Sequence, residues 1–126
     1  MEVSEKIIIT NDMVHKFAEV SGDRNPIHID DEYASKTIFG KRIVHGMLLS
    51  SLFSKMIAET YPGKGSIYLN QSLNFKNPCY INDEVVVTIK LLNEIDGKYT
   101  LRTTIHRDDI ILVHGDALVL KRLKVW

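Results

Sequence analysis

The stretch that decides the fold of this protein is residues 44–61, VHGMLLSSLFSKMIAETY. Its apolar side chains cover far more of a helical surface than the single stripe of an amphipathic helix. They are Val44, Met47, Leu48, Leu49, Leu52, Phe53, Met56, Ile57 and Ala58. Pro62 and Gly63 follow and are typical of a helix end. The sequence therefore predicts a long helix, from Val44 to about Tyr61, that is buried.

After this helix the apolar residues recur with a period of two, which is typical of half-buried strands. Four such series follow one another, at Ile67, Leu69, Leu73 and Phe75; Val85, Val87, Ile89 and Leu91; Tyr99, Leu101, Thr103 and Ile105; and Ile111, Val113, Ala117 and Val119. Asp96-Gly97 is a strong hairpin signal, and Arg107–Asp109 also suits a turn. Sequential antiparallel pairing is the simplest topology, and we expect an α+β domain whose sheet wraps the helix.

The residues before the long helix predict three shorter elements. Ile7–Ile9 is typical of a strand, and a helix capped by Thr10 or Asn11 should run to about Val20. Gly22 suits the left-handed end of that helix. A short helix is expected at Asp31–Ser35, with acidic residues in its first turn, where the helix dipole favours them.

Length and charge limit the classes of function. With 126 residues and a mass of 14.4 kDa, the chain is expected to form one domain, residues 1–126. Lys plus Arg and Asp plus Glu each number 16, with no long run of one sign, so binding to nucleic acid or to a membrane surface is not expected. The partner should be a small molecule or a second copy of the chain.

The location of the protein is expected to be cytoplasmic. Cys79 is the only cysteine, which excludes an internal disulfide and fits a reducing compartment. The first residues lack the pattern of a signal peptide, and no apolar run approaches the roughly 20 residues that span a bilayer.

Asp23-Arg24-Asn25-Pro26-Ile27-His28 combines an acid and an imidazole on a segment that Gly22 and Pro26 should keep as a loop. A carboxylate beside an imidazole can divide the proton transfers of adding or removing water. The alternative is structural, because an Asp before a turn often caps backbone N–H groups and a single His is often a core residue. The spacing alone leaves both interpretations open.

A second chemical cluster opens the long helix. The first N–H groups of a helix have no internal partner, and Gly46 would let a ligand approach them, as in an oxyanion hole. Alternatively, His45 caps the helix and Gly46 only permits close packing. Ser50, Ser51 and Ser54 lie farther along, where the default for a buried serine is a hydrogen bond to its own helix.

Two other kinds of site are considered and not favoured. The side chains of Asp23, His28, Asp30, Asp31 and His45 include metal-ligand types, but their spacing lacks a tight ligand motif, and no metal is expected. The segment 63–66 resembles part of a phosphate loop without its full spacing, so it predicts a turn.

Three ordered motifs together resemble the R-specific enoyl-CoA hydratases of the MaoC-like family. They are the segments 17–30, FAEVSGDRNPIHID; 43–48, IVHGML; and 63–78, whose parts GKGSIYL and QSLNFKNP continue the match. The likeness covers nearly the whole chain. It implies a hot-dog fold, in which a curved antiparallel sheet wraps a long helix, usually as a homodimer. It also implies reversible syn hydration of a trans-2-enoyl thioester to an (R)-3-hydroxyacyl thioester.

The resemblance also implies roles for individual residues. The catalytic acid falls on Asp23, the catalytic histidine on His28 and the backbone oxyanion donor on Gly46. Asn25 and His45 match residues that support the site, and Ser54 corresponds to a serine lining the acyl-chain pocket. No metal or organic cofactor is implied, and the substrate would be carried by coenzyme A or by acyl carrier protein.

Two other functions remain open at this point. A hot-dog thioesterase would hydrolyse the thioester, but its acid typically lies on or near the central helix, where this chain offers only Glu59 at the far end. A non-catalytic module that binds acyl thioesters would keep the pocket and need neither Asp23 nor His28.

Overall fold

The computed structural model describes residues 1–122. Six strands and four helices follow one another in the order β1 (Glu2–Ile8), α1 (Asn11–Ser21), α2 (Pro26–Ile29), α3 (Asp31–Ser35), α4 (Gly46–Glu59), β2 (Ile67–Gln71), β3 (Asn74–Phe75), β4 (Glu84–Ile95), β5 (Lys98–Arg107) and β6 (Ile110–Leu120).

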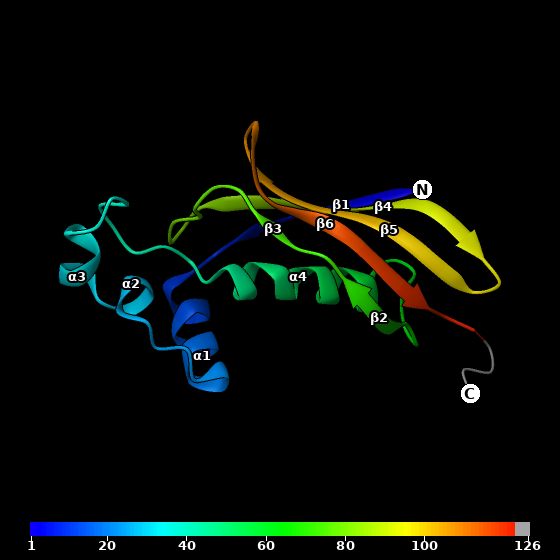
Figure 1. The fold of residues 1–126 in the computed structure, drawn as a ribbon, viewed down its shortest axis with the longest axis horizontal. Coiled ribbons are helices and arrows are strands. Elements are labelled where there is room, and N and C mark those ends of the chain that lie inside the picture. Colours follow the sequence, from blue (N-terminus) through cyan, green and yellow to red (C-terminus); the bar gives the residue numbers. More distant parts are fainter. Residues whose placement is uncertain (123–126) are drawn as a thin grey trace.

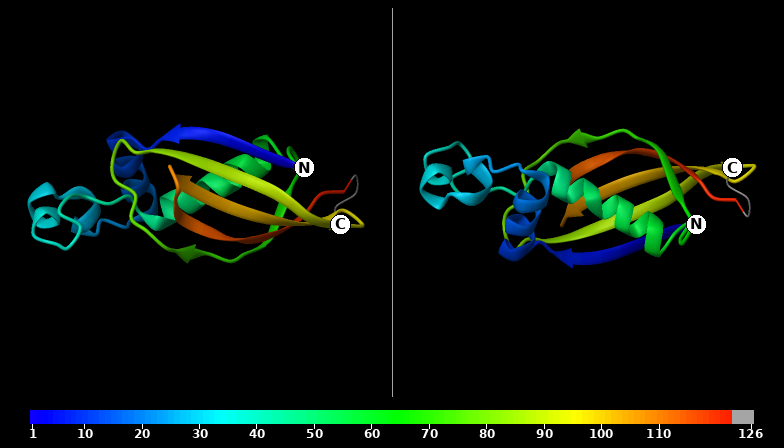
Figure 2. Two further views of the ribbon diagram at one scale, coloured as in Figure 1. Left: turned by 90° about the horizontal axis from the view of Figure 1, so that it is seen from above. Right: turned by 90° about the horizontal axis from the view of Figure 1, so that it is seen from below.

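The strands form one curved antiparallel sheet, and α4 lies across its concave face (Figures 1 and 2). The strand order is β1-β4-β5-β6-β2, with β3 also paired to β6. Helices α2 and α3 form a small lobe beyond the N-terminal end of α4 (Figure 1). The α+β class and the long helix on an antiparallel sheet are thus as predicted.

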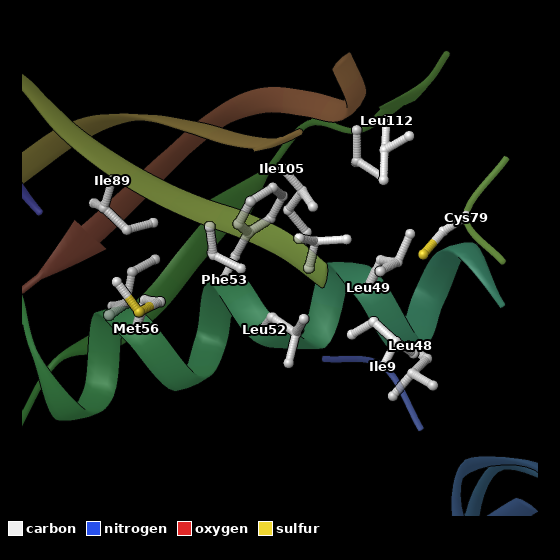
Figure 3. Packing of buried hydrophobic residues seen from close by; sticks show 14 of the residues in the cluster. Ile9, Leu48, Leu49, Leu52, Phe53, Met56, Cys79, Ile89, Ile105 and Leu112 are labelled. Carbon is white, nitrogen blue, oxygen red and sulfur yellow. The ribbon is translucent and has the colours of Figure 1, made fainter. Parts of the chain in front are cut away.

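The core lies between α4 and the sheet. Phe53 is fully buried and Met56 nearly so, on the side of α4 that faces the strands (Figure 3). The inward residues of β4 and β5 are also fully buried, and they are Val85, Val87, Ile89, Leu101, Thr103 and Ile105. The period of two correctly predicted which face of these two strands is inside.

The prediction of sequential pairing was correct only for β4, β5 and β6. Asp96 and Gly97 form the predicted hairpin turn, both with positive φ. However, β2 and β3 pair with β6, and the free edge of β4 pairs with β1. A central strand has only two edges, so pairing with β1 and β5 leaves β4 no edge for the strand that precedes it.

The predicted single strand over 67–75 is broken into β2 and β3. At the break the chain passes very close to β6, since a Cβ at Gly115 would lie 1.8 Å from the Ser72 carbonyl oxygen. Leu69 and Phe75 are 42% and 54% exposed, so the apolar alternation here does not mark a buried face in the single chain.

The prediction for the long helix was wrong in its bounds and in its complete burial. The helix spans Gly46–Glu59 rather than Val44 to Tyr61, and one of its faces is exposed. Met47 is 57% exposed, and Ala58 is exposed too. The reason is that the sheet of one chain covers only one side of α4. Within residues 1–122, no helix has both the length and the apolar character needed to cross a membrane.

Strand β6 also departs from the predicted alternation. Ile111 is 38% exposed, whereas Leu112 and Val113 are both buried. The register shifts here, with Ile105 opposite Val113 and His106 opposite Ile111, so Leu112 is an extra residue that reverses the alternation.

The N-terminal predictions were largely correct. Thr10 caps α1, and Gly22 ends it with φ of 80°. The first strand lies earlier than predicted, at Glu2–Ile8, and Ile9 is buried just beyond it. Helix α3 has the predicted bounds, Asp31–Ser35.

Candidate active site

Three polar side chains predicted from two separate motifs meet at the N-terminal end of α4. Ligand-type atoms of Asp23, His28 and His45 all lie within 4.8 Å of one another. Asp23 follows the end of α1, His28 lies on α2, and His45 immediately precedes α4. The tertiary structure therefore joins the two chemical clusters of the sequence into one site.

His28 lies on a short helix, and not on a loop as predicted. Pro26 occupies the first turn of α2, and the Asn25 side chain caps it by accepting a hydrogen bond from the Ile27 N–H at 3.3 Å. Proline is well suited to the first position of a helix because its missing N–H would have had no partner there. The loop prediction failed because the turn after Pro26 closes into a helix of four residues.

One hydrogen bond determines the orientation of the His28 ring. Its Nδ1 lies 2.8 Å from the carbonyl oxygen of Ile43. A carbonyl oxygen can only accept, so Nδ1 carries the proton and donates it. In the neutral ring the other nitrogen, Nε2, then has a free lone pair. His28 is 9% exposed and lines a cavity, so this ring can exchange a proton with a bound molecule.

His45 connects the other two members of the site. Its Nε2 donates to the backbone carbonyl of Asp23 at 3.0 Å, and its ring stacks on that of His28 with centroids 3.9 Å apart. The ring is 1% exposed, and it makes no cap hydrogen bond to α4. The alternative in which the His45 side chain caps the helix is therefore not what the structure contains.

Burial lowers the pKa of His45 below its ordinary value of 6.5, although the hydrogen bond to Asp23 opposes this effect. Among the described residues, His45 Nδ1 is a buried nitrogen without a hydrogen-bond partner. Once Nε2 donates its proton, a neutral ring leaves only a lone pair on Nδ1, which a desolvated site tolerates better than a charged ring. These features suit a supporting residue that stays neutral.

The Asp23 carboxylate is exposed in the single chain. One of its oxygens accepts a hydrogen bond from the Asn25 N–H at 3.2 Å, as expected for an Asp that stabilises a turn. That bond occupies part of its acceptor capacity, because an ionised carboxylate has two oxygens. Asp23 can thus stabilise the turn and still reach a ligand in the cavity.

The cavity at this site has a volume of about 480 Å³. Asp23, His28, His45 and Gly46 form its polar end, and most other lining residues are apolar. The apolar lining consists of Phe39, Ile43, Val44, Met47, Leu49, Phe75, Pro78, Cys79 and Val113, with Lys76 and Asn77 also present. Such a cavity suits a ligand with one polar reacting group and an apolar remainder.

Gly46 begins α4, and within residues 1–122 no side chain caps this helix end. A Cβ on Gly46 would lie 2.6 Å from the ring of Phe75, so the glycine also allows this ring to approach closely. Both interpretations of Gly46 from the sequence therefore have structural support. Phe75 itself was missed as a site residue, because its position in an alternating series indicated only a strand.

Ser54 does not line this cavity in the single chain and lies on the exposed face of α4. Ser50 and Ser51 donate to the carbonyl oxygens of Gly46 and Leu48, which confirms the default for these two serines. Glu59 is at the opposite end of α4 from His45.

The other acids considered as metal ligands have structural roles. Asp30 caps α3 by accepting from the Tyr33 N–H, and Asp31 pairs with Arg42. The rings of His28 and His45 are stacked with an interplanar angle of 27°. A metal ion lies in the plane of each imidazole that binds it, so two stacked rings do not direct their lone pairs to one point without a rotation. This geometry does not favour one metal ion shared by the two rings.

Comparison with known proteins places the chain in a family. The model of the MaoC like domain matches residues 1–111. An (R)-specific enoyl-CoA hydratase from Aeromonas caviae is 46% identical over 109 residues, which cover 84% of this chain and 81% of that protein. A 3-hydroxybutyryl-CoA dehydratase from Methylorubrum extorquens is 38% identical, with coverage of 94% and 76%.

Solved structures agree with these sequence matches. The (R)-hydratase of A. caviae superimposes with a TM-score of 0.92 at 40% identity, over 97% of this chain and 95% of that one. An unliganded R-hydratase from Pseudomonas aeruginosa gives a TM-score of 0.93 at 34% identity, over 98% and 81%. The predicted hot-dog fold is thereby confirmed. With most of its length matched by the family model and by these relatives, the chain belongs to the MaoC-like domain family.

Proposed function

We propose that this protein catalyses the reversible, (R)-specific hydration of trans-2-enoyl-CoA to (R)-3-hydroxyacyl-CoA. The observation that carries the proposal is the meeting of Asp23 and His28 at the polar end of an otherwise apolar cavity. Two relatives, 46% and 38% identical in sequence to this chain, are named (R)-specific enoyl-CoA hydratases, which supports the same reaction. A hydro-lyase of this kind needs no metal or organic cofactor, because the thioester already makes the C2 proton acidic.

In the proposed mechanism Asp23 and His28 act on one water molecule. As the water oxygen forms a bond to C3, one of the two groups accepts a proton from it, and the other donates a proton to C2. The net change is the addition of water across the C2–C3 double bond. The Nδ1–H···O bond to Ile43 keeps His28 Nε2 available for this exchange.

The thioester oxygen gains negative charge while the proton is added at C2. We propose that the backbone N–H of Gly46 donates to this oxygen, helped by the other uncapped N–H groups at the start of α4. Asn25 would support the site by capping α2, and His45 by binding the Asp23 carbonyl.

A thioesterase is the second candidate, and the position of Glu59 does not favour it. Glu59 is 13 residues after Gly46 on α4, which at 1.5 Å per residue puts it about 20 Å from the polar end of the cavity. An acid at that distance cannot act on a thioester bound beside His28.

The deciding assay follows crotonyl-CoA with the purified protein. Hydration should remove the absorbance of the conjugated double bond, form the (R)-3-hydroxy product on chiral analysis and release no free thiol. Thiol release would indicate a thioesterase, and binding without turnover would indicate a module that only holds acyl thioesters. Repeating the assay with crotonyl-acyl carrier protein compares the two carriers.

We also propose that the protein works as a homodimer in the cytoplasm. The exposed apolar residues Met47, Tyr68, Leu69 and Phe75 lie on α4 and on the strands β2 and β3, where a second copy would cover them. Light scattering at micromolar concentration should give twice the chain mass, and a monomer mass would contradict the dimer. Cell fractionation tests the location.

A further inference from the structure

The short helix that carries His28 needs support from outside. Helix α2 has only four residues, far fewer than an isolated helix needs to be stable in water. Its N-terminal end is capped by Asn25. The carbonyl groups at its other end require donors from elsewhere in the chain.

Arg42 and Ile43 supply these donors. The N–H of Ile43 donates to the Ile27 carbonyl at 3.2 Å, and Nη1 of Arg42 contacts the His28 carbonyl at 3.4 Å. The Ile43 carbonyl in turn accepts the proton of His28 Nδ1. Two adjacent residues therefore hold both the backbone of His28 and its ring.

The Arg42 side chain is itself held by two further contacts. Its Nε donates to Asp31 at 2.8 Å, and Nη1 donates to the Asn11 side chain at 2.9 Å. Its side chain is 14% exposed, although that of Asp31 is 86% exposed. One guanidinium thus connects α1, α2 and α3. The planar fork of donors in arginine allows these contacts at the same time, and a lysine ammonium does not reproduce them.

We infer that Arg42 is a positioning residue for catalysis, which holds His28 with Nδ1 protonated toward Ile43 and Nε2 free toward the substrate. Arg42 does not line the cavity, so it acts through His28 and not by contact with the substrate. The inference rests on the proposed role of His28.

The test compares Arg42→Gln and Arg42→Lys with the wild-type protein. Because a displacement of about 1 Å at a reacting group can cost on the order of a hundredfold in rate, we expect Arg42→Gln to lower kcat at least tenfold. KM for crotonyl-CoA should change by less than about twofold, since the cavity wall is unaltered. Arg42→Lys keeps the charge without the fork, so its kcat should lie between the other two.

The matched control is Arg102→Gln. Arg102 pairs with Asp116 on the strands β5 and β6 and does not line the cavity, so this variant should keep the wild-type kcat. Thermal melting of all variants identifies any loss of the folded protein, and rates are compared per folded molecule.

A spectroscopic readout separates this inference from the proposed function. Nitrogen NMR of histidine-labelled protein, without substrate, should show His28 with its proton on Nδ1 in the wild type and a mixture of both tautomers in Arg42→Gln. A wild-type kcat together with an unchanged tautomer would overturn the inference, as would a lowered kcat with an unchanged tautomer. A mixed tautomer with a wild-type kcat would support the positioning by Arg42 and contradict the catalytic role of His28.

Discussion

The two ends of α4 differ in how they are held. Around the N-terminal end, the side chains of His28 and His45 bind backbone carbonyl oxygens, those of Ile43 and Asp23. Farther along the helix, Phe53 and Met56 are packed among apolar side chains of the sheet (Figure 3). The first end adds directional hydrogen bonds between short segments to the apolar packing of Leu48 and Leu49, and farther along the helix close packing dominates.

This difference implies that the two ends serve different purposes. Hydrogen bonds orient a ring within a narrow range but add little net stability, since the unfolded chain bonds to water instead. Apolar packing contributes most of the stability and is not directional. Substitutions at the N-terminal end should therefore lower activity, and substitutions in the packed half should lower stability.

The largest effect is expected from Asp23→Asn. The amide keeps the shape of the side chain but cannot accept a proton, so the hydration rate should fall by about 10² to 10⁴. The melting temperature should stay close to wild type because Asp23 is exposed. Crotonyl-CoA hydration and thermal melting on one preparation check both. A variant that keeps more than about a tenth of the wild-type rate would remove Asp23 from the mechanism.

His28→Ala should reduce the rate to a similar extent, by about 10² to 10⁴. If Asp23 and His28 act on the same water, the double variant should be little slower than either single variant, since groups that act as a unit are not additive. Steady-state rates of the three variants provide the measurement. Losses that multiply fully would show that the two residues serve separate steps.

Phe53→Ala tests the packed half of the helix. Phe53 is fully buried, so removing its ring should lower the free energy of unfolding by about 3–5 kcal/mol. Hydration per folded molecule, measured well below the melting temperature, should stay near wild type. Lys55→Ala, on the exposed side of α4, is the control and should change stability by less than about 1 kcal/mol. A stable but inactive Phe53→Ala protein would contradict the division between the two ends.

His45 should make the protein less stable as the pH falls. Burial places its folded pKa below the ordinary 6.5, so the unfolded chain binds the proton more readily. The stability from the neutral ring is present above pH 6.5 and is lost as the pH falls below it toward the folded pKa. Melting temperatures of the wild type and of His45→Gln should therefore converge as the solution becomes acidic. A constant difference between them would contradict this account.

The smallest effect is expected from Ser54→Leu. Ser54 is eight residues after Gly46, about 12 Å along the helix axis, and we propose that it contacts the far end of the acyl chain in the dimer. The larger side chain should reduce activity on longer enoyl chains by about 0.8 kcal/mol for each excluded methylene, with crotonyl turnover unchanged. A rate profile against chain length provides the measurement. An unchanged profile with a lowered melting temperature would instead indicate overpacking.

Local patterns in the sequence were enough to predict several parts of the fold. The caps at Thr10 and Gly22, the hairpin at Asp96-Gly97 and the buried face of β4 were all correct. Each depends on residues within a few positions of one another, because caps, tight turns and the alternation of side chains are properties of a short segment.

The candidate site residues came from motifs, but their arrangement came only from tertiary structure. Along the chain, α3 and the segment after it separate Asp23 and His28 from His45, and no local pattern indicates that the His45 ring stacks on His28. The acceptor for His28 is a backbone carbonyl, at Ile43, which every residue type supplies. For that reason neither contact could be predicted from residue types.

The sequence by itself determined the α+β class, the main helix and the candidate residues for proton transfer. Tertiary structure decided which strands share an edge, which face of α4 is exposed, and that Asp23, His28 and His45 meet at one cavity. The physical reason is that residue preferences act over a few positions, whereas pairing of β2 and β3 with β6, and contacts such as Arg42 with Asn11, join residues far apart in the chain. Those contacts depend on the packing of the whole molecule.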